Sequence, residues 1–459
     1  MRQPLLLFIY LWIFIFPFTL FGQDSLKLTL ESSLEYAFKQ NPEYRIARTE
    51  LDKAEKSIRE AYSSILPQLN GSASFQHAWK IQESTIPNFI KTMMGPAAPP
   101  GLPDFVKISF ALENTFTYGA TVNQPLFLGG AGIAGIQAAI AAKRASQQNL
   151  EANKQNLIYQ TANAFYACLL AKELITVQEE ALNQARANLD VVIKKYDVGS
   201  ASGYDRMRAQ VDVANLQPPL IAAKNNYQSA LTQLRTIIGL NQEAEIQVVG
   251  QFAYTEDNLD SMGLQDLQDR AFRSRPEILA LLQQKTISRK GIDIARSEFL
   301  PKLYFSTDYS FLANKENLRI SQSDFSRGFT SSLNLQIPLF HGFRSTSQYQ
   351  KAKLDYKIVL DTEKQARDGV AAEVEFAYNK FNESKEKYQS AKETVQLAQE
   401  SLRLANLMYE EGTNTQLDVL NSQLALTQAR MNYVSSLYEY QVARYQLRKA
   451  TGILEGILS

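Results

Sequence analysis

The chain has 459 residues, of which 48 are lysine or arginine and 47 are aspartate or glutamate. This near-neutral balance argues against a nucleic-acid-binding protein, which would carry a basic surplus or a basic stripe. The single cysteine, Cys168, cannot form an internal disulfide, and its apolar neighbours favour a small buried residue.

Residues 1–22 have the pattern of a secretory signal peptide. Arg2 precedes an apolar run from Leu5 to Phe21, and we expect cleavage near Gly22. An uncleaved membrane anchor is the alternative interpretation. No cysteine follows the run directly, which excludes acylation of a mature N-terminal cysteine. Arg2 is the only charged residue of the segment, so the mature chain would have a net charge of zero, and it contains no further apolar run of about 18 residues.

Most of the remaining chain is a duplication. The matched positions are Pro42 and Pro276, Pro67 and Pro301, Pro125 and Pro338, Gly199 and Gly412, and Gly239 and Gly452. The separation falls from 234 to 213 residues after the second pair, so the first copy contains 21 additional residues there. We predict a signal peptide at 1–22, a first repeat at 23–240, a linker at 241–265 and a second repeat at 266–459.

Gly130, Gly132 and Gly135 spell G-x-G-x-x-G, the pattern of a dinucleotide-binding turn. The second copy keeps Pro-Leu-Phe-x-Gly but loses these glycines, and the helical run that follows is far longer than a crossover helix. What both copies share is a strand that ends at a proline, followed by a glycine that lets the chain turn into a helix.

Each copy contains two runs that alternate between apolar and polar residues: Leu69–Trp79 and Phe116–Asn123, then Leu303–Phe311 and Phe329–Ile337. Such alternation predicts a sheet with one apolar face. The small polar residues suit a wet lumen and the aromatic residues suit lipid, so we favour a membrane barrel over a soluble sandwich. Four strands cannot close a barrel, so several chains must share one. The proline- and glycine-rich segment 86–105 is predicted to be a plain loop beyond the membrane.

Long helices follow the strands. Residues Ile133–Tyr196 contain no proline, and 64 residues correspond to a helix of about 100 Å. Ser345–Tyr409 matches this run in the second copy. A heptad pattern runs along the second long helix and its returning helix, and small alanines between its larger members allow close helix neighbours, as in a coiled coil. Its members are Tyr388, Val395, Leu402 and Tyr409, interleaved with Ala391, Ala398 and Ala405, on the long helix, and Leu417, Leu424, Met431, Tyr438 and Tyr445 on the returning helix.

Pro218-Pro219 is expected to break the first returning helix near Leu216, since proline lacks a backbone donor and collides with the preceding turn. The second returning helix has Met431 and Asn432 at the matching positions, so we predict that it runs straighter.

Short turns join each long helix to its returning helix. Gly199 and Gly412 suit the left-handed conformation that ends a helix, and Ser202 and Thr415 can cap the helices that follow.

Two acids, Asp205 and Asp418, fall early in the returning helices, near the positive ends of the helix dipoles. One interpretation is dipole pairing on a solvated surface. The other is a ring of carboxylates at the end of a tube.

The doubled Pro-Leu-Phe-x-Gly, the doubled Leu-Pro before a strand and the doubled Tyr-x-x-Gly turns with an aspartate six residues later resemble the TolC-like outer-membrane efflux proteins. The resemblance covers nearly the whole mature chain. It implies a mixed α and β membrane protein, internally duplicated: a homotrimer in the outer membrane, with four strands from each protomer in a shared β-barrel and long coiled-coil helices forming a periplasmic tunnel. It also implies a mixed equatorial region, passive conduction, and docking to a periplasmic adaptor (membrane fusion) protein and an inner-membrane pump.

The resemblance also suggests a gate at the inner end of the tunnel. Tyr409, Asp205 and Asp418 match a gate tyrosine, a tip acid and a pore-lining aspartate of the family. Asn414 stands where well-studied members have an arginine, and Asn421 where they have a second aspartate. Without the arginine, the charge-assisted bond to Asp205 cannot form as it does in those members, and a neutral hydrogen bond is about half as strong, so we expect a looser gate. Because Asn421 replaces the second aspartate, we also expect one carboxylate ring, formed by Asp418, instead of two.

The hairpin tips are the expected adaptor contacts. They comprise Val198, Gly199, Ser200, Glu411, Gly412 and Thr413.

Other functions have less support in the sequence. No cofactor or metal is predicted, because neither His77 nor His341 has a second ligand at metal spacing, and no nucleophile elbow or Walker loop is present. An enzyme is therefore not expected. An exported coiled-coil scaffold or adhesin that does not span a membrane is the main alternative. A nutrient porin would leave the long helices without a purpose.

Overall fold

The computed structural model describes residues 26–109, 111–254 and 261–454, so the predicted signal peptide lies outside the described residues. The chain forms two compact units. One comprises Met1–Arg45, Lys154–Gly263 and Glu375–Ser459, and the other comprises Ile46–Asn153 and Leu264–Val374. Each unit therefore combines segments of both repeats.

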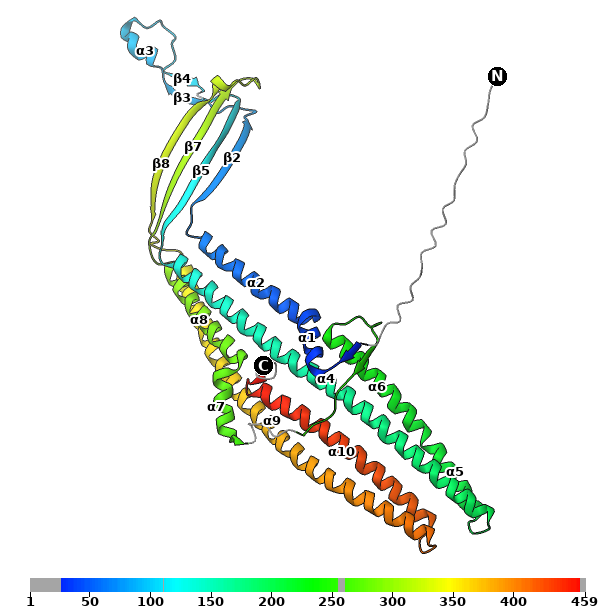
Figure 1. Ribbon diagram of the computed structural model, residues 1–459. Helices are drawn as coiled ribbons and strands as arrows, with labels where there is room; N and C mark the ends of the chain where they lie inside the picture. Colours follow the sequence, from blue (N-terminus) through cyan, green and yellow to red (C-terminus); the bar gives the residue numbers. More distant parts are fainter. Residues whose placement is uncertain (1–25, 110, 255–260, 455–459) are drawn as a thin grey trace, which may run out of the picture. The chain divides into compact units, whose positions relative to one another are not determined.

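The second unit contains a four-stranded antiparallel sheet in the order β2-β5-β7-β8 (Figure 1). Its strands are β2 (Gln68–His77), β5 (Asn114–Leu128), β7 (Lys302–Lys315) and β8 (Ser326–Gln336). The four predicted alternating runs are thus confirmed as neighbouring strands. Trp79, which we placed in the first run, lies just beyond β2 and packs edge-on against His77.

The sheet has two chemically different faces, as the alternation predicts. One face carries an aromatic ladder, in which Tyr118 stacks on Phe311 with ring centroids 4.6 Å apart. On the other face small polar side chains bind one another across strands, including Ser306 Oγ, which donates to Asn123 Oδ1 at 2.8 Å. Asp308 adds a carboxylate to this polar face and accepts a hydrogen bond from the Thr121 hydroxyl.

The segment predicted as a plain loop between the first two strands has structure of its own. Its elements are β3 (Ser84–Pro87), α3 (Phe89–Met94), a 3-10 turn (Gly95–Ala97) and β4 (Phe105–Ile108), with β3 and β4 paired antiparallel. Asn88 caps α3 and also donates to Pro103 O at 3.0 Å, while Lys91 binds Asp104 at 2.6 Å. These local bonds order a segment whose composition alone favours a loop.

The two long helices are confirmed at almost the predicted bounds. They are α4 (Ala131–Asp197) and α9 (Arg344–Glu410), each of 67 residues. Shorter helices precede the strands of each repeat: α1 (Leu30–Gln40) and α2 (Pro42–Ser63), then α7 (Leu264–Ser274) and α8 (Pro276–Ser297). None of the described helices has both the length and the apolar character needed to cross a membrane.

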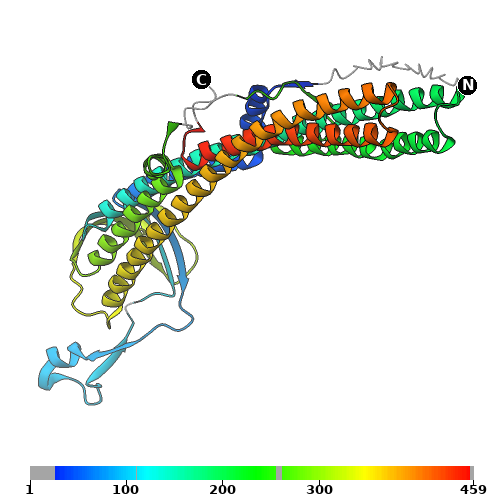
Figure 2. The same ribbon diagram turned by 90° about the horizontal axis from the view of Figure 1, so that it is seen from below.

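The returning helices differ as the prolines predict. The first is divided into α5 (Gly203–Asn215) and α6 (Gln217–Ile238), and the junction falls at Leu216. The second, α10 (Gln416–Ala450), is continuous. In the first unit α4 with α5 and α6 forms a first hairpin, and α9 with α10 forms a second hairpin (Figure 2).

The heptad stripe predicted on α10 does not form one continuous seam. Leu417 and Leu424 are 42% and 69% exposed and do not lie in the seam with α9. That seam is offset by two residues and contains Val419, Leu426, Tyr433 and Tyr440, which pack near Leu402, Tyr388 and Phe381. The remaining predicted members, Met431, Tyr438 and Tyr445, instead contact Gln178, Asn163 and Tyr166 of α4. α10 therefore carries two stripes, one toward each neighbouring helix.

The main core of the first unit surrounds a short parallel pair, β1 (Leu26–Leu28) with β6 (Ile246–Val248). The N-terminal segment and the linker thus meet, in agreement with the equatorial region that the resemblance implies. Cys168 lies in this core with no exposed surface, and burial raises the pKa of its thiol to about 12.

We expect the Cys168 thiol to resist alkylation at neutral pH in the folded protein, because the thiolate is the reactive form and the sulfur is buried. Maleimide labelling followed by mass measurement tests this, with denatured protein as the control that should take up one label per chain. Rapid labelling of the folded protein would contradict the described core.

Candidate functional site

The two hairpin tips have the same backbone design. Gly199 and Gly412 are left-handed, with φ of 76° and 80°. Each glycine N–H donates to a carbonyl of the long helix, from Gly199 to Tyr196 at 2.9 Å and from Gly412 to Tyr409 at 3.2 Å. The predicted role of both glycines is confirmed. A side chain at either position would be strained, so the turns stay tight.

Capping boxes begin both returning helices. Asp205 Oδ2 accepts hydrogen bonds from the Ser202 hydroxyl at 2.6 Å and the Ser202 N–H at 3.0 Å. Asp418 Oδ2 accepts the same pair from Thr415, at 2.6 Å and 3.0 Å. These hydrogen bonds hold the pKa values of both carboxyl groups below their usual value, and the bonds from the hydroxyl groups have the largest effect. Both aspartates are therefore charged at neutral pH and tied to their helix ends.

The two tips contact each other through Lys195 and Tyr409. Lys195, in the last turn of α4, donates from Nζ to the Tyr409 carbonyl at 2.7 Å. The same ammonium lies over the Tyr409 ring, 3.9 Å from its centroid. Burial raises the pKa of the Tyr409 hydroxyl, and the charge of Asp205 raises it further. The structure thus brings Tyr409 near Asp205, and the phenol stays neutral at neutral pH.

The other predicted site residues lie in the two turns and at the start of α10. The N–H of Asn414 donates to Met408 O at 3.1 Å, so its backbone belongs to the second turn. Among the described residues, no hydrogen bond of the Asn414 side chain is found. Asn421 is exposed in the second turn of α10. The tip residues Val198, Gly199, Ser200, Glu411, Gly412 and Thr413 are all exposed.

A polar pocket of about 210 Å³ lies between the hairpins next to Tyr409. It is lined by α4, α9 and α10, with carboxamides from Gln184, Asn188, Asn406 and Gln423. Asn188 is 8% exposed, and its Nδ2 atom has no hydrogen-bond partner. The sequence analysis identified neither this pocket nor Lys195. The spacing of Gln184 and Asn188, four residues apart on one helix face, was the available signal.

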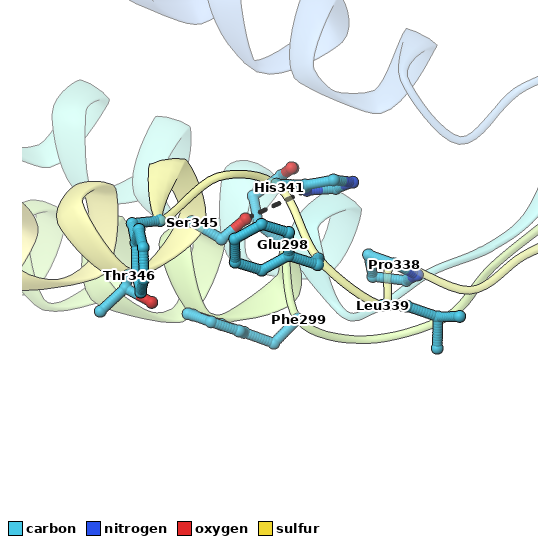
Figure 3. A pocket seen from close by; sticks show the side chains of 9 residues that line it. Glu298, Phe299, Pro338, Leu339, His341, Ser345 and Thr346 are labelled. Atoms are coloured by element: carbon cyan, nitrogen blue, oxygen red, sulfur yellow. Dashed lines mark hydrogen bonds between the residues drawn. The ribbon is translucent and has the colours of Figure 1, made fainter.

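A second small pocket, of about 170 Å³, lies in the other unit at the start of α9 (Figure 3). His341 Nδ1 is 3.2 Å from Ser345 Oγ, and Glu298 also lines the pocket. Glu298 is already paired with Lys302 at 2.7 Å, and Ser345 is buried in the first turn of α9. The arrangement of His341, Ser345 and Glu298 is therefore explained by side-chain packing at the start of α9. The described residues contain no cluster of three or more metal-ligating side chains.

The aromatic-faced antiparallel sheet, the duplicated order of elements and the paired hairpins of long helices define a class of membrane channel proteins. The family model "Outer membrane efflux protein" matches residues 34–240 and 267–453, and the chain belongs to this family.

Known relatives agree with this assignment. The chain is 24% identical over 420 residues to the outer membrane protein TolC of Salmonella enteritidis, with 90% of this chain and 80% of that protein covered. It is 22% identical to the alkaline protease secretion protein AprF of Pseudomonas aeruginosa, with 97% and 88% covered. The crystal structure of the Campylobacter jejuni CmeC outer membrane channel matches with a TM-score of 0.75 at 19% identity, covering 92% of this chain and 85% of that one.

The protein is therefore an outer-membrane efflux channel that extends into the periplasm. Its relatives are channel proteins, not enzymes. The alternative of an exported scaffold that does not span a membrane is not favoured.

Proposed function

We propose that three copies of this chain form one channel, in which β2 of each copy pairs with β8 of the next. The observation that carries this proposal is the open sheet: β2 and β8 are its two edge strands, and its aromatic face is exposed. In lipid an unpaired strand edge leaves backbone donors and acceptors unsatisfied, so the sheet must close. We also propose, as a separate point, that the first repeat ends at residue 240 and the second begins at residue 266.

The channel conducts its cargo passively from the periplasm to the exterior, and the partner pump supplies the energy. An adaptor contacts the exposed tips, Val198–Ser200 and Glu411–Thr413, because these turns are the exposed ends of both hairpins. The protein requires no cofactor or metal for this role.

The gate is formed at the tips by Asp205, Tyr409, Asn414, Asp418 and Asn421. Asn414 carries no charge, so it cannot form the bidentate ion pair with Asp205 that an arginine would form. With Asn421 uncharged, Asp418 supplies a single ring of three carboxylates in the trimer.

Conductance of the purified protein in planar bilayers tests this function. We expect wild-type trimers to give discrete channels, and Asn414→Arg to lower the fraction of time spent open by about tenfold, since an ion pair with Asp205 is added where the Asn414 side chain forms no hydrogen bond. Asn225→Arg adds the same charge at an exposed position of α6, away from the tips, and serves as the control. If the wild-type protein forms no channels, the proposed conduction is contradicted. If Asn414→Arg leaves the fraction of time spent open unchanged, the proposed role of position 414 in the gate is contradicted.

A further inference from the structure

The contact between Lys195 and Tyr409 joins the two hairpins of one chain at their ends. It consists of two parts, a hydrogen bond from the ammonium to the Tyr409 carbonyl and a cation–π contact with the Tyr409 ring. Both parts are made by one side chain and lie within one unit of the structure. Lys195 is half-buried, whereas its neighbour Lys194 is exposed.

A cation is physically suited to this position. α4 ends at Asp197 and α9 ends at Glu410, so the negative ends of two long helices come together at the tips. The Tyr409 carbonyl belongs to the last turn of α9, where carbonyl groups have no partner within the helix. It accepts one bond from Gly412 N–H, and Lys195 supplies a second, charged donor. Lys195 thereby offsets the repulsion between the two helix ends.

Next to this contact, the hairpins enclose polar space. The polar pocket lined by Gln184, Asn188 and Gln423 begins beside Tyr409, and the buried Asn188 Nδ2 has no protein partner there. A space of this size and polarity suits water, which can exchange hydrogen bonds as the helices slide. The Lys195 contact therefore lies at the tip end of this polar part of the interface, whereas farther along the helices Ile158 and Tyr445 pack in an apolar cluster.

We propose that Lys195 is a positioning residue of the gate: it holds Tyr409 and the end of the second hairpin against the first hairpin, and opening requires this contact to break. The proposal rests on the gate function proposed above for the tips. In this chain, where position 414 is an asparagine, Lys195 would supply the charged contact that keeps the gate closed.

Bilayer recordings on the full-length trimer provide the test. Lys195→Met keeps the length and apolar stem of the side chain but removes the charge. We expect it to raise the fraction of time spent open by about tenfold, the effect of losing a charge-assisted bond together with an exposed cation–π contact. Lys195→Arg should restore wild-type closure, since guanidinium can make both contacts. Lys194→Met removes the adjacent exposed charge and should behave as wild type.

Coupling to Tyr409 separates a positioning role from a general structural one. Tyr409→Ala removes the ring, and combining it with Lys195→Met should open the channel less than the sum of the two single effects. If Lys195→Met does not assemble, Tyr409→Ala with and without Lys195→Gln gives the same comparison. If the wild type conducts but Lys195→Met is unchanged, or if the two effects are additive, the positioning role of Lys195 is overturned and the proposed channel function is unaffected. A wild type that does not conduct overturns the proposed function itself.

Discussion

Gly119→Val is expected to abolish assembly of the channel in the outer membrane. Gly119 lies in the middle of β5, paired with Ser72 of β2 on one side and Ser310 of β7 on the other. A Cβ atom at this position would lie 2.7 Å from the Tyr309 carbonyl oxygen and 2.9 Å from Ser310 Cα. Both are backbone atoms of a strand that is itself held in the sheet, so neither can move aside cheaply.

The cost of such overpacking is typically about 1–3 kcal/mol per chain, and valine adds two methyl groups beyond the colliding Cβ atom. Every copy in the proposed trimer carries the change, and closure of the shared sheet depends on all of them. The measurement is the amount of heat-modifiable trimer in detergent extracts of outer membranes.

Two glycines of the same sheet serve as controls. A Cβ atom at Gly328 would lie 3.6 Å from Ser310 Oγ, and one at Gly71 would lie 3.9 Å from Gly119 O, both ordinary contacts. Gly328→Ala and Gly71→Ala should therefore assemble normally. If Gly119→Val also gives normal amounts of trimer, the close approach of β5 and β7 is not a requirement of the fold.

Local patterns were sufficient for most of the fold. Alternation located four strands because side chains of a strand alternate between faces. The absence of proline from Ile133–Tyr196 located α4, and Pro218-Pro219 located the junction at Leu216. Each of these effects acts within a few residues along the chain, so it can be predicted from the sequence without knowledge of tertiary contacts.

The pairing of α10 could not be obtained in this way. Its apolar residues form two stripes separated by two positions, and heptad spacing fits both. Which stripe faces α9 depends on the shapes of residues such as Phe381 and Tyr388, which are more than forty positions away in sequence. The same limit explains the excursion at 84–108, where Asn88 and Lys91 find partners in Pro103 and Asp104 across the segment.

For the candidate site, the tips themselves were predictable from the duplicated glycines and caps. The capping boxes also show why Asp205 and Asp418 lie where they do: each satisfies donors at a helix start, whatever further role it has in the channel. Lys195 was not predictable, because lysine in the last turn of a helix is common and its partner, Tyr409, lies on another hairpin.

The second large effect is expected for Gly239→Val, in the core of the first unit. Gly239 ends α6 in the left-handed conformation, with φ of 75°. A Cβ atom there would lie 2.7 Å from the carbonyl carbon and oxygen of Gln40 and 3.0 Å from Asn41 N. The collision would push apart the ends of α1 and α6, which Asn41 joins by donating from Nδ2 to Ile237 O at 2.8 Å.

Three costs add at this position. A left-handed conformation costs a residue with a side chain roughly 1–2 kcal/mol, the overpacking about 1–3 kcal/mol, and loss of the buried Asn41 bond about 1 kcal/mol. Gly130→Val is the matched control, because Gly130 is also left-handed, with φ of 89°, but has nothing within 4 Å of an added Cβ atom. Urea or thermal midpoints of the detergent-solubilised proteins should fall much further for Gly239→Val than for Gly130→Val. Equal shifts would mean that backbone strain alone accounts for the loss, and that α6 does not depend on its close approach to Gln40.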